Sequence, residues 1–272
     1  MRARQRLPGS AGFSLVELAI VLLVVTLMLS SLLYTLSAQT EQRNFEDTRR
    51  RLEQARELVL AFAIVNGRLP CPATAASAGV EDPVGGGNCT TPNGGWLPAR
   101  TIGFQTTDPN GFAIDAWSNR IRYAVSATVP INSDAPRICR PLVNPAPPPN
   151  FLPPIAPHFT DRNNMKLQGI DCQPSDLLIC KSATGITGTT CGGTANQIMT
   201  QNLVVAIIFS TGKNGATGGT GLDEAANLNG DQVFVFHVPA PSGAANGEFD
   251  DQFTWITVGE LYGKLIAAGV LP

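Results

Sequence analysis

The sequence predicts an α+β fold, in which one long N-terminal helix packs on a head built around a mostly antiparallel sheet. The first observation is an almost uncharged apolar segment at residues 13–36, which an amphipathic pattern extends to Val65 without a helix breaker. The second is a series of strand-like segments after residue 118 with no helical pattern between them. Parallel strands need long crossover connections, usually helices, so this order favours antiparallel pairing.

The N-terminal segment, residues 13–36, contains a single charged residue, Glu17. As a helix it would be about 36 Å long, which exceeds a hydrocarbon core of roughly 30 Å. Arg2, Arg4 and Arg6 precede it without an acidic residue, and such a basic flank favours a cytoplasmic N-terminus. The sequence therefore predicts that residues 13–36 form a transmembrane helix.

Two simpler interpretations of this segment stay open. A secretory signal peptide would need a cleavage site of small residues, for which Ser37-Ala38-Gln39 is a weak match. A plain membrane anchor is the other interpretation. Neither accounts for Glu17, because a carboxylate within an apolar membrane segment costs about 2.5–3.5 kcal/mol on insertion scales and normally has a partner.

The helix is expected to continue through residues 37–66 as an amphipathic segment. One face carries a stripe with alternating spacings of three and four: Phe45, Thr48, Leu52, Ala55, Val59 and Phe62. Asn66-Gly67, followed by Pro70, is a strong stop signal. One helix from Phe13 to about Val65 would be roughly 80 Å long.

The remaining residues, 67–272, are expected to form a globular head. Residues 67–110 are rich in Gly and Pro and indicate loops, and the Pro-rich insertion at 141–157 indicates a surface loop. Four segments have the pattern of strands: Asn119–Val129, Asn202–Ser210, Asp231–Val238 and Asp251–Val258. Thr257-Val258-Gly259-Glu260 has the pattern of a capping box and predicts a short closing helix.

The N-terminus carries a family resemblance. Gly12-Phe13-Ser14-Leu15-Val16-Glu17, between a short basic leader and an apolar segment, resembles the cleavage and methylation signature of type IV pilins and type II secretion pseudopilins. The resemblance implies that a prepilin peptidase cuts after Gly12 and methylates the new N-terminal Phe13. It also implies an assembly role for Glu17, whose carboxylate would pair with the Phe13 amine of a neighbouring subunit.

Shorter segments of the head resemble the same family. Asp115-Ala116-Trp117 resembles the Asp-x-Trp-Gly segment of pseudopilin heads, although Ser118 stands where that pattern has Gly. Ser210-Thr211-Gly212-Lys213 is similar to a turn that follows the central strand in such heads, and Asp250-Asp251 is similar to the acidic pair that opens their last strand.

The resemblance implies a pilin-like lollipop with defined parts. These are a leader at 1–12, a transmembrane and filament-core helix at 13–36, its amphipathic continuation at 37–66 and a periplasmic head at 67–272. The implied location is the inner membrane, crossed once with a cytoplasmic N-terminus, and then a filament or the cell surface after assembly. The implied partners are the prepilin peptidase, other pilin or pseudopilin subunits and the inner-membrane assembly platform.

Six cysteines follow the apolar segment: Cys71, Cys89, Cys139, Cys172, Cys180 and Cys191. No Cys-x2-Cys pair is present, which disfavours zinc and redox motifs. An even number in an oxidising exported compartment favours disulfides, although six cysteines allow about 15 connectivities. We expect neighbours to pair, as Cys71–Cys89, Cys139–Cys172 and Cys180–Cys191.

Acidic residues near the C-terminus suggest a metal site. Asp223, Glu224, Asn229 and Asp231 lie in or beside a Gly- and Asn-rich stretch, and Asp250-Asp251 follow further along the chain. Hard oxygen ligands on a flexible loop suit calcium, and the resemblance points the same way, because some pseudopilin heads bind calcium in their late loops. The expected calcium ligands are Asp223, Asp231, Asp250 and Asp251, and a solvated turn without metal is the alternative.

Composition and motifs argue against catalysis and nucleic-acid binding. Charged residues make up 15% of the chain and the net charge is −2, which disfavours a nucleic-acid partner. No hydrolase, phosphate-loop or metalloprotease motif is present. The sequence therefore predicts a non-enzymatic structural subunit, minor rather than abundant, of a type IV pilus or a type II secretion pseudopilus. The alternative is a single-pass membrane-tethered periplasmic binding or adhesin module that does not polymerise.

Overall fold

The computed structural model describes residues 14–127, 157–219 and 221–271, without the side chains of residues 31–38, 167, 168 and 171. The chain divides into two compact units, Met1–Asn44 and Phe45–Pro272. The expected leader at 1–12 lies outside the described residues, as does the Pro-rich insertion at 141–157 apart from its last residue. The second unit contains both sheets and is the head of the molecule.

Helix α1 spans Leu15–Asn66, which is close to the predicted range. It ends at the predicted stop signal, where Gly67 adopts a left-handed φ of 69°. The Gly67 N–H donates to the Ala63 carbonyl at 2.8 Å, a hydrogen bond typical of a helix C-terminus that a glycine closes.

The predicted transmembrane half of this helix is not borne out. Among the residues that the structure describes, no helix combines the length and the apolar character that a membrane crossing requires.

The first sheet is antiparallel throughout and has the order β1-β2-β5-β7. Its strands are β1 (Gly95–Trp96), β2 (Arg122–Val125), β5 (Val204–Ser210) and β7 (Gln252–Thr257). Three of them lie inside predicted strand segments, so the antiparallel expectation holds for this sheet.

A second sheet corrects the predicted fold class further. It has the order β4-β3-β6, with β3 at Leu178–Cys180, β4 at Gln197–Met199 and β6 at Val233–Val235. Strands β3 and β4 are antiparallel, whereas β3 and β6 are parallel. The head is therefore α+β, but it contains two sheets in place of one. Strand β6 lies inside the predicted segment Asp231–Val238, whereas no predicted strand segment covers β3 or β4.

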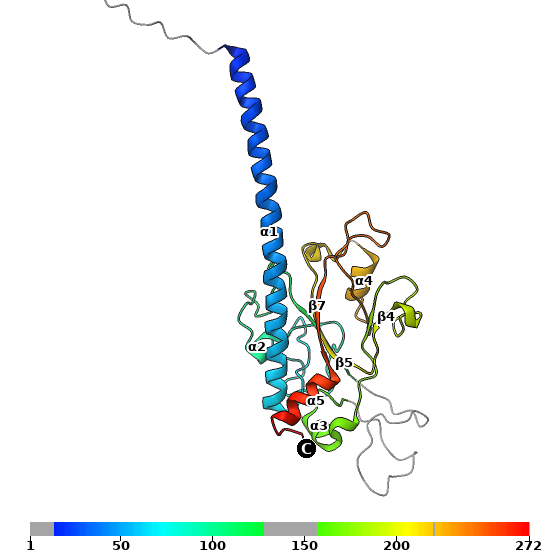
Figure 1. The fold of residues 1–272 in the computed structure, drawn as a ribbon. Helices are drawn as coiled ribbons and strands as arrows, with labels where there is room; N and C mark the ends of the chain where they lie inside the picture. Colours follow the sequence, from blue (N-terminus) through cyan, green and yellow to red (C-terminus); the bar gives the residue numbers. More distant parts are fainter. Residues whose placement is uncertain (1–13, 128–156, 220, 272) are drawn as a thin grey trace, which may run out of the picture. The chain divides into compact units, whose positions relative to one another are not determined.

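Strand β5 is the centre of the head, because both of its faces are buried. Val205 and Ile208 belong to one core together with Leu52, Val59 and Ala63 of α1. On the opposite face, Ile207 and Phe209 pack with Ile179 and Phe234 of the second sheet. The first sheet thus lies between the C-terminal part of α1 and the second sheet, as Figure 1 shows. This double burial explains why β5 is apolar at every position from Val204 to Phe209.

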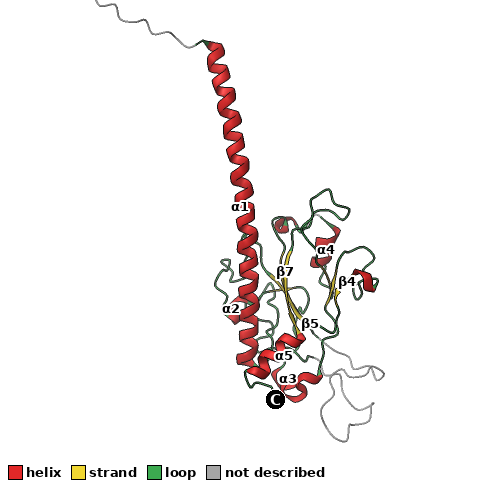
Figure 2. Ribbon diagram, viewed as in Figure 1, coloured by secondary structure: helices red, strands yellow, loops and turns green. Residues whose placement is uncertain are grey.

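Short helices and long loops complete the head (Figure 2). The α-helices are α2 (Ala99–Ile102), α3 (Arg162–Gln168), α4 (Leu222–Leu228) and α5 (Val258–Ala267). Helix α5 is the predicted closing helix, and the Thr257 hydroxyl caps it by accepting from the Glu260 N–H at 3.3 Å. Helix α4 lies inside a Gly- and Asn-rich stretch that was predicted to be a loop.

Candidate functional site

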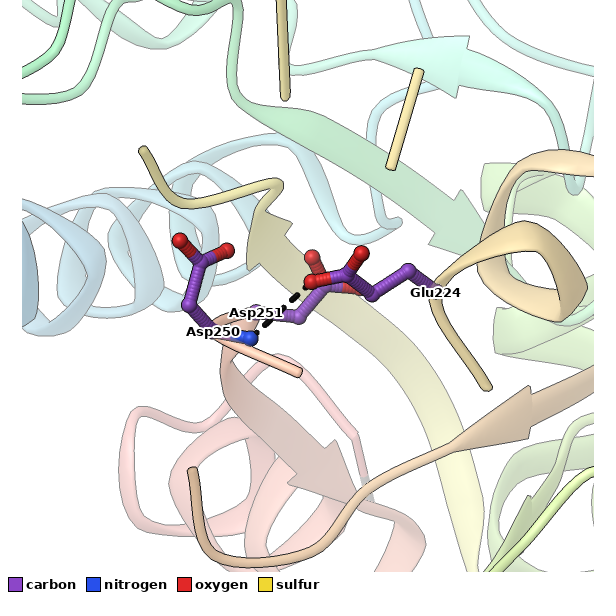
Figure 3. Close-up of side chains that lie close together, drawn as sticks. All are labelled: Glu224, Asp250 and Asp251. Atoms are coloured by element: carbon purple, nitrogen blue, oxygen red, sulfur yellow. Dashed lines mark hydrogen bonds between the residues drawn. The ribbon is translucent and has the colours of Figure 1, made fainter. Parts of the chain in front are cut away.

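Three buried carboxylates meet in the head. Glu224, Asp250 and Asp251 each place one oxygen within 4.8 Å of the other two. Their residues are 1%, 6% and 4% exposed, respectively. Figure 3 shows Glu224 extending from α4 towards the two aspartates. We call these three residues the acidic cluster.

Two elements far apart in sequence form the acidic cluster. Glu224 lies in the first turn of α4, where one carboxylate oxygen accepts from the N–H of Gly221 at 3.4 Å. The other oxygen accepts from the Asp250 N–H at 3.0 Å. This second hydrogen bond ties α4 to the residues that enter β7 at Gln252. The cluster therefore fixes α4 against the first sheet.

Neutral donors surround each carboxylate. The Asn214 side-chain amide donates to both oxygens of Glu224 at 2.9 Å. The backbone N–H of Lys213 donates to Asp250 Oδ2 at 2.9 Å, and Asn227 Nδ2 donates to Asp251 Oδ2 at 2.7 Å. Asp250 Oδ1 is buried without a hydrogen-bond partner among the described residues. One acceptor of the cluster is thus left without a hydrogen bond from the described residues.

The turn after β5 holds Asp250 in place. Gly212 adopts φ 61°, a left-handed conformation that favours glycine. A Cβ on this residue would also collide with the Asp250 carboxylate. Ser210 Oγ accepts from the Gly212 N–H at 3.1 Å and itself donates to Asp115 Oδ2 at 2.6 Å. The turn therefore links the acidic cluster to the segment around Asp115.

Burial raises the pKa values of both aspartates. Asp250 has a pKa of about 6, chiefly because desolvation disfavours its charged form, while the Lys213 N–H opposes this and the nearby Glu224 adds to it. The pKa of Asp251 lies well above its ordinary value because of burial, opposed by the Asn227 amide and reinforced by Glu224 and Asp250. Three carboxylates this close favour either shared protons or a bound cation.

The donor set of the acidic cluster fits a hard divalent cation. Calcium binds oxygen ligands at about 2.3–2.6 Å, so two ligands on opposite sides of one ion are separated by roughly 5 Å. The separations within the cluster fall inside that limit. Glu224, Asp250 and Asp251 would hold the ion. Buried carboxylates without a compensating cation would repel one another, which favours this occupancy.

The cluster includes two of the four predicted calcium ligands. Asp223, next to Glu224, instead accepts from the Asn246 side chain at 3.0 Å and lies 3.1 Å from His237 Nε2. Asp231 accepts from the N–H of Val233 at 2.8 Å, which starts strand β6. Both side chains thus fix local structure, and neither belongs to the cluster.

Glu224 is the residue that the sequence analysis left out of the ligand set. The Gly- and Asn-rich sequence around Glu224 predicts a loop, and in a loop the directions of the Asp223 and Glu224 side chains cannot be told apart. A usable signal was present, because a glutamate three residues after Gly221 suits the third position of a helix.

Glu17 has a local partner in the structure. Its carboxylate accepts from the Ser14 N–H at 3.0 Å, and Ser14 Oγ accepts from the Val16 N–H at 3.3 Å. This reciprocal arrangement is close to a capping box at the start of α1. Gly12 and Phe13, the predicted processing residues, lie outside the described residues.

The head contains two described disulfides, Cys71–Cys89 and Cys180–Cys191. They are two of the three neighbouring pairs that the sequence predicts. Cys172 is also disulfide-bonded, and Cys139 lies outside the described residues.

Comparison with known proteins does not identify a family for this chain. No family model, curated protein or solved structure matches the chain.

Proposed function

We propose that the protein is a non-enzymatic subunit of a filament of the type IV pilus or type II secretion pseudopilus kind. The proposal starts from Gly12-Phe13-Ser14-Leu15-Val16-Glu17, which resembles the cleavage and methylation signature of those subunits. A prepilin peptidase would remove residues 1–12 and methylate Phe13. The other proposed partners are neighbouring pilin or pseudopilin subunits and the inner-membrane assembly platform.

The surface of α1 is the observation that supports this proposal best. Every large apolar side chain from Leu15 to Leu29 is exposed, from 41% at Val24 to 84% at Leu15. A continuous apolar surface of this kind is costly in water and marks an interaction site. Packing against the same helix of neighbouring subunits would bury all sides of it at once.

Glu17 would have two roles in this proposal. In the single chain its carboxylate caps the start of α1 through the Ser14 N–H. In the filament it would also pair with the Phe13 amine that processing creates on a neighbouring subunit. Such a pair neutralises two charges that are expensive to bury, and it would set the register between subunits.

The head fits an exported and minor subunit. Disulfides form in oxidising compartments, so Cys71–Cys89 and Cys180–Cys191 favour a location outside the cytoplasm. The described Glu224–Asp250–Asp251 cluster would stiffen the head by binding calcium. The size of the head favours a minor or tip-associated position over that of the abundant repeating subunit.

Two substitutions of Glu17 test the proposal, because they separate capping from charge. Glu17→Gln keeps an oxygen that can accept from the Ser14 N–H, whereas Glu17→Leu removes it. Removing one member of a buried ion pair typically costs about 3–5 kcal/mol. We therefore expect both variants to be produced and processed normally but to be strongly depleted from sheared filaments and from cross-links to neighbouring subunits.

Glu53→Gln is the matched control, because Glu53 is an exposed glutamate on the same helix. It should enter filaments as the wild type does. Normal assembly of Glu17→Gln together with failure of Glu17→Leu would reduce Glu17 to a helix cap. Equal incorporation of all variants would show that Glu17 has no role in assembly. Absence of the wild type itself from sheared filaments and from such cross-links would contradict the filament proposal and favour a module that does not polymerise.

A further inference from the structure

A polar pocket of about 310 Å³ lies on the head, and none of the three acidic-cluster residues lines it, although Leu228 of α4 and Thr211 do. Its wall combines one aromatic side chain, two arginines and several hydroxyl and amide groups. The lining residues that matter here are Trp96, Ser118, Asn119, Arg120, Arg122 and Thr211. They come from β1, from the turn before β2, from β2 and from the turn after β5. We call this the arginine pocket.

The two arginines of the pocket differ in their partners. Arg120 Nε donates to Asp108 Oδ2 at 2.7 Å, so its charge is balanced. Arg122 has no ion pair with a carboxylate in the part of the chain that the structure describes, and its one hydrogen bond goes to the Gly94 carbonyl at 3.3 Å. Its pKa is lowered by burial and by the neighbouring charge of Arg120. The pocket therefore contains a partly desolvated positive charge that has no counter-ion among the described residues.

Trp96 holds the Arg122 side chain in a fixed position. The guanidinium of Arg122 lies 5.0 Å from the centre of the Trp96 ring, within the range of a cation–π contact. Stacking of this kind occupies the face of the guanidinium, and Nη1 donates to the Gly94 carbonyl, so the Nε–Nη2 edge is the one available to a ligand. A planar, fixed donor edge is the group that binds a carboxylate with two parallel hydrogen bonds.

The rim of the pocket contains a strained polar residue. Ser118 adopts φ 70°, a left-handed conformation that costs a residue with a side chain about 1–2 kcal/mol and that glycine would adopt freely. Its side chain lines the pocket, as do those of Thr211 and Asn119. Residues kept in strained conformations cluster at binding sites, because there the side chain contributes something that glycine would not.

We propose that the arginine pocket binds a sugar acid, with Arg122 holding the carboxylate. The volume is at the lower end of the range for small-molecule sites, which is about 300–1,000 Å³, and matches one monosaccharide better than a peptide chain. The hydroxyl groups of Ser118 and Thr211 suit the hydroxyl groups of a sugar. The Asn119 amide nitrogen already donates to the Gly212 carbonyl at 2.6 Å, so its side-chain oxygen is the atom that could accept from the sugar. The carboxylate supplies the counter-ion that Arg122 lacks. This inference does not depend on the filament proposal.

Equilibrium titration of the full-length chain with glucuronate tests this inference, with glucose as the neutral probe of the same shape. Wild type should bind glucuronate and should bind glucose at least tenfold more weakly. Arg122→Gln should lower the affinity for glucuronate by about tenfold or more, because a charge-assisted bidentate contact is lost. The glucuronate affinity of Arg122→Lys should lie between those of the wild type and Arg122→Gln, since lysine keeps the positive charge but lacks the two parallel N–H donors of a guanidinium.

Arg100→Gln is the control for general electrostatics, because Arg100 is exposed and lies outside the lining of the pocket. It should leave glucuronate affinity within about twofold of wild type. Thermal unfolding of each variant verifies the fold. Three results would overturn the proposal: no binding of glucuronate at millimolar concentration, equal binding by Arg122→Gln, or equal binding of glucose. Binding of a peptide rich in glutamate in place of glucuronate would also overturn it, in favour of a protein partner.

Discussion

Gly212 shows how a residue without a side chain positions a carboxylate. Its φ of 61° turns the chain after β5, and the space that a Cβ would occupy is filled by Asp250. The Lys213 N–H, the next backbone donor, then reaches Asp250 Oδ2. The sequence predicts a turn at this glycine, because Ser210-Thr211-Gly212-Lys213 resembles a turn in pseudopilin heads. Only the structure shows that the turn contacts Asp250.

Gly212→Ala is expected to destabilise the head by about 2–4 kcal/mol, because it combines left-handed strain with a displaced Asp250. Gly218→Ala is the matched control in the same loop, with φ 82° and no atom near the added Cβ. Its unfolding free energy should fall by only about 1 kcal/mol, which is the cost of the left-handed backbone conformation alone. Chemical denaturation measures both values. Equal losses for the two variants would show that Asp250 does not depend on the turn.

Ser118 differs from Gly212 because a residue with a side chain occupies a left-handed turn. It stands where the resembling pattern has glycine, and the structure keeps the left-handed turn with a serine in it. The sequence could identify the position as unusual because of the pattern around Asp115 and Trp117. It could not show that the serine side chain lines a pocket, because Arg122 and Thr211 come from other strands and turns.

At the scale of elements, the contact between α4 and the start of β7 should respond to pH. The folded protein holds a proton on Asp250 up to a pKa of about 6, whereas the ordinary pKa of an aspartate is 3.8. The folded state therefore binds more protons than the unfolded chain between these values. By linkage, the stabilising effect of this protonation is fully present below pH 4 and disappears as the pH rises through about 6.

In the absence of divalent cations, lowering the pH from 7 to 5 should therefore raise the Asp250 contribution to unfolding free energy by about 1–2 kcal/mol. The raised pKa of Asp251 acts in the same direction. Denaturation at both pH values in the presence of a chelator gives the measurement. Asp250→Asn should remove most of this dependence, and an unchanged pH response in that variant would refute the assignment.

Calcium should stabilise the same contact at pH 7. A ligand present at 100 times its dissociation constant stabilises the folded state by about 2.7 kcal/mol, which thermal unfolding detects as a higher melting temperature. Glu224→Gln should abolish most of this shift. Asp231→Asn should leave it intact, because Asp231 lies outside the acidic cluster. An equal melting temperature of wild type with calcium and with chelator would exclude the ion.

At the scale of the whole molecule, processing is the property that the sequence predicts most specifically. Mass spectrometry of the protein from its native cells should identify N-methyl-Phe13 as the first residue. Gly12→Val should retain residues 1–12, because a side chain at this position would block the close approach of the peptidase to the bond after it. Met1 or Ala38 as the first residue of the wild type would contradict the family resemblance.

The sequence by itself determined the features that local patterns encode. Helix α1 could be predicted because its apolar and amphipathic periodicities run without interruption to Asn66. Strand β5 could be predicted because burial on both faces makes a strand apolar at every position. The same reasoning overestimated the N-terminal part of α1, where an apolar composition suggested a membrane crossing, because no helix among the described residues combines the length and the apolar character that a crossing requires.

Only the tertiary structure decided which acidic residues share a site. Asp223 and Glu224 are adjacent, and in an extended loop either could have joined Asp250 and Asp251. Helix α4 separates their side-chain directions by about 100°. Glu224 therefore meets the Asp250 N–H, while Asp223 turns to Asn246 and His237. The carboxylates lie in the same part of the sequence. Three of them come together because α4 directs Glu224 towards Asp250, and because β5 pairs with β7.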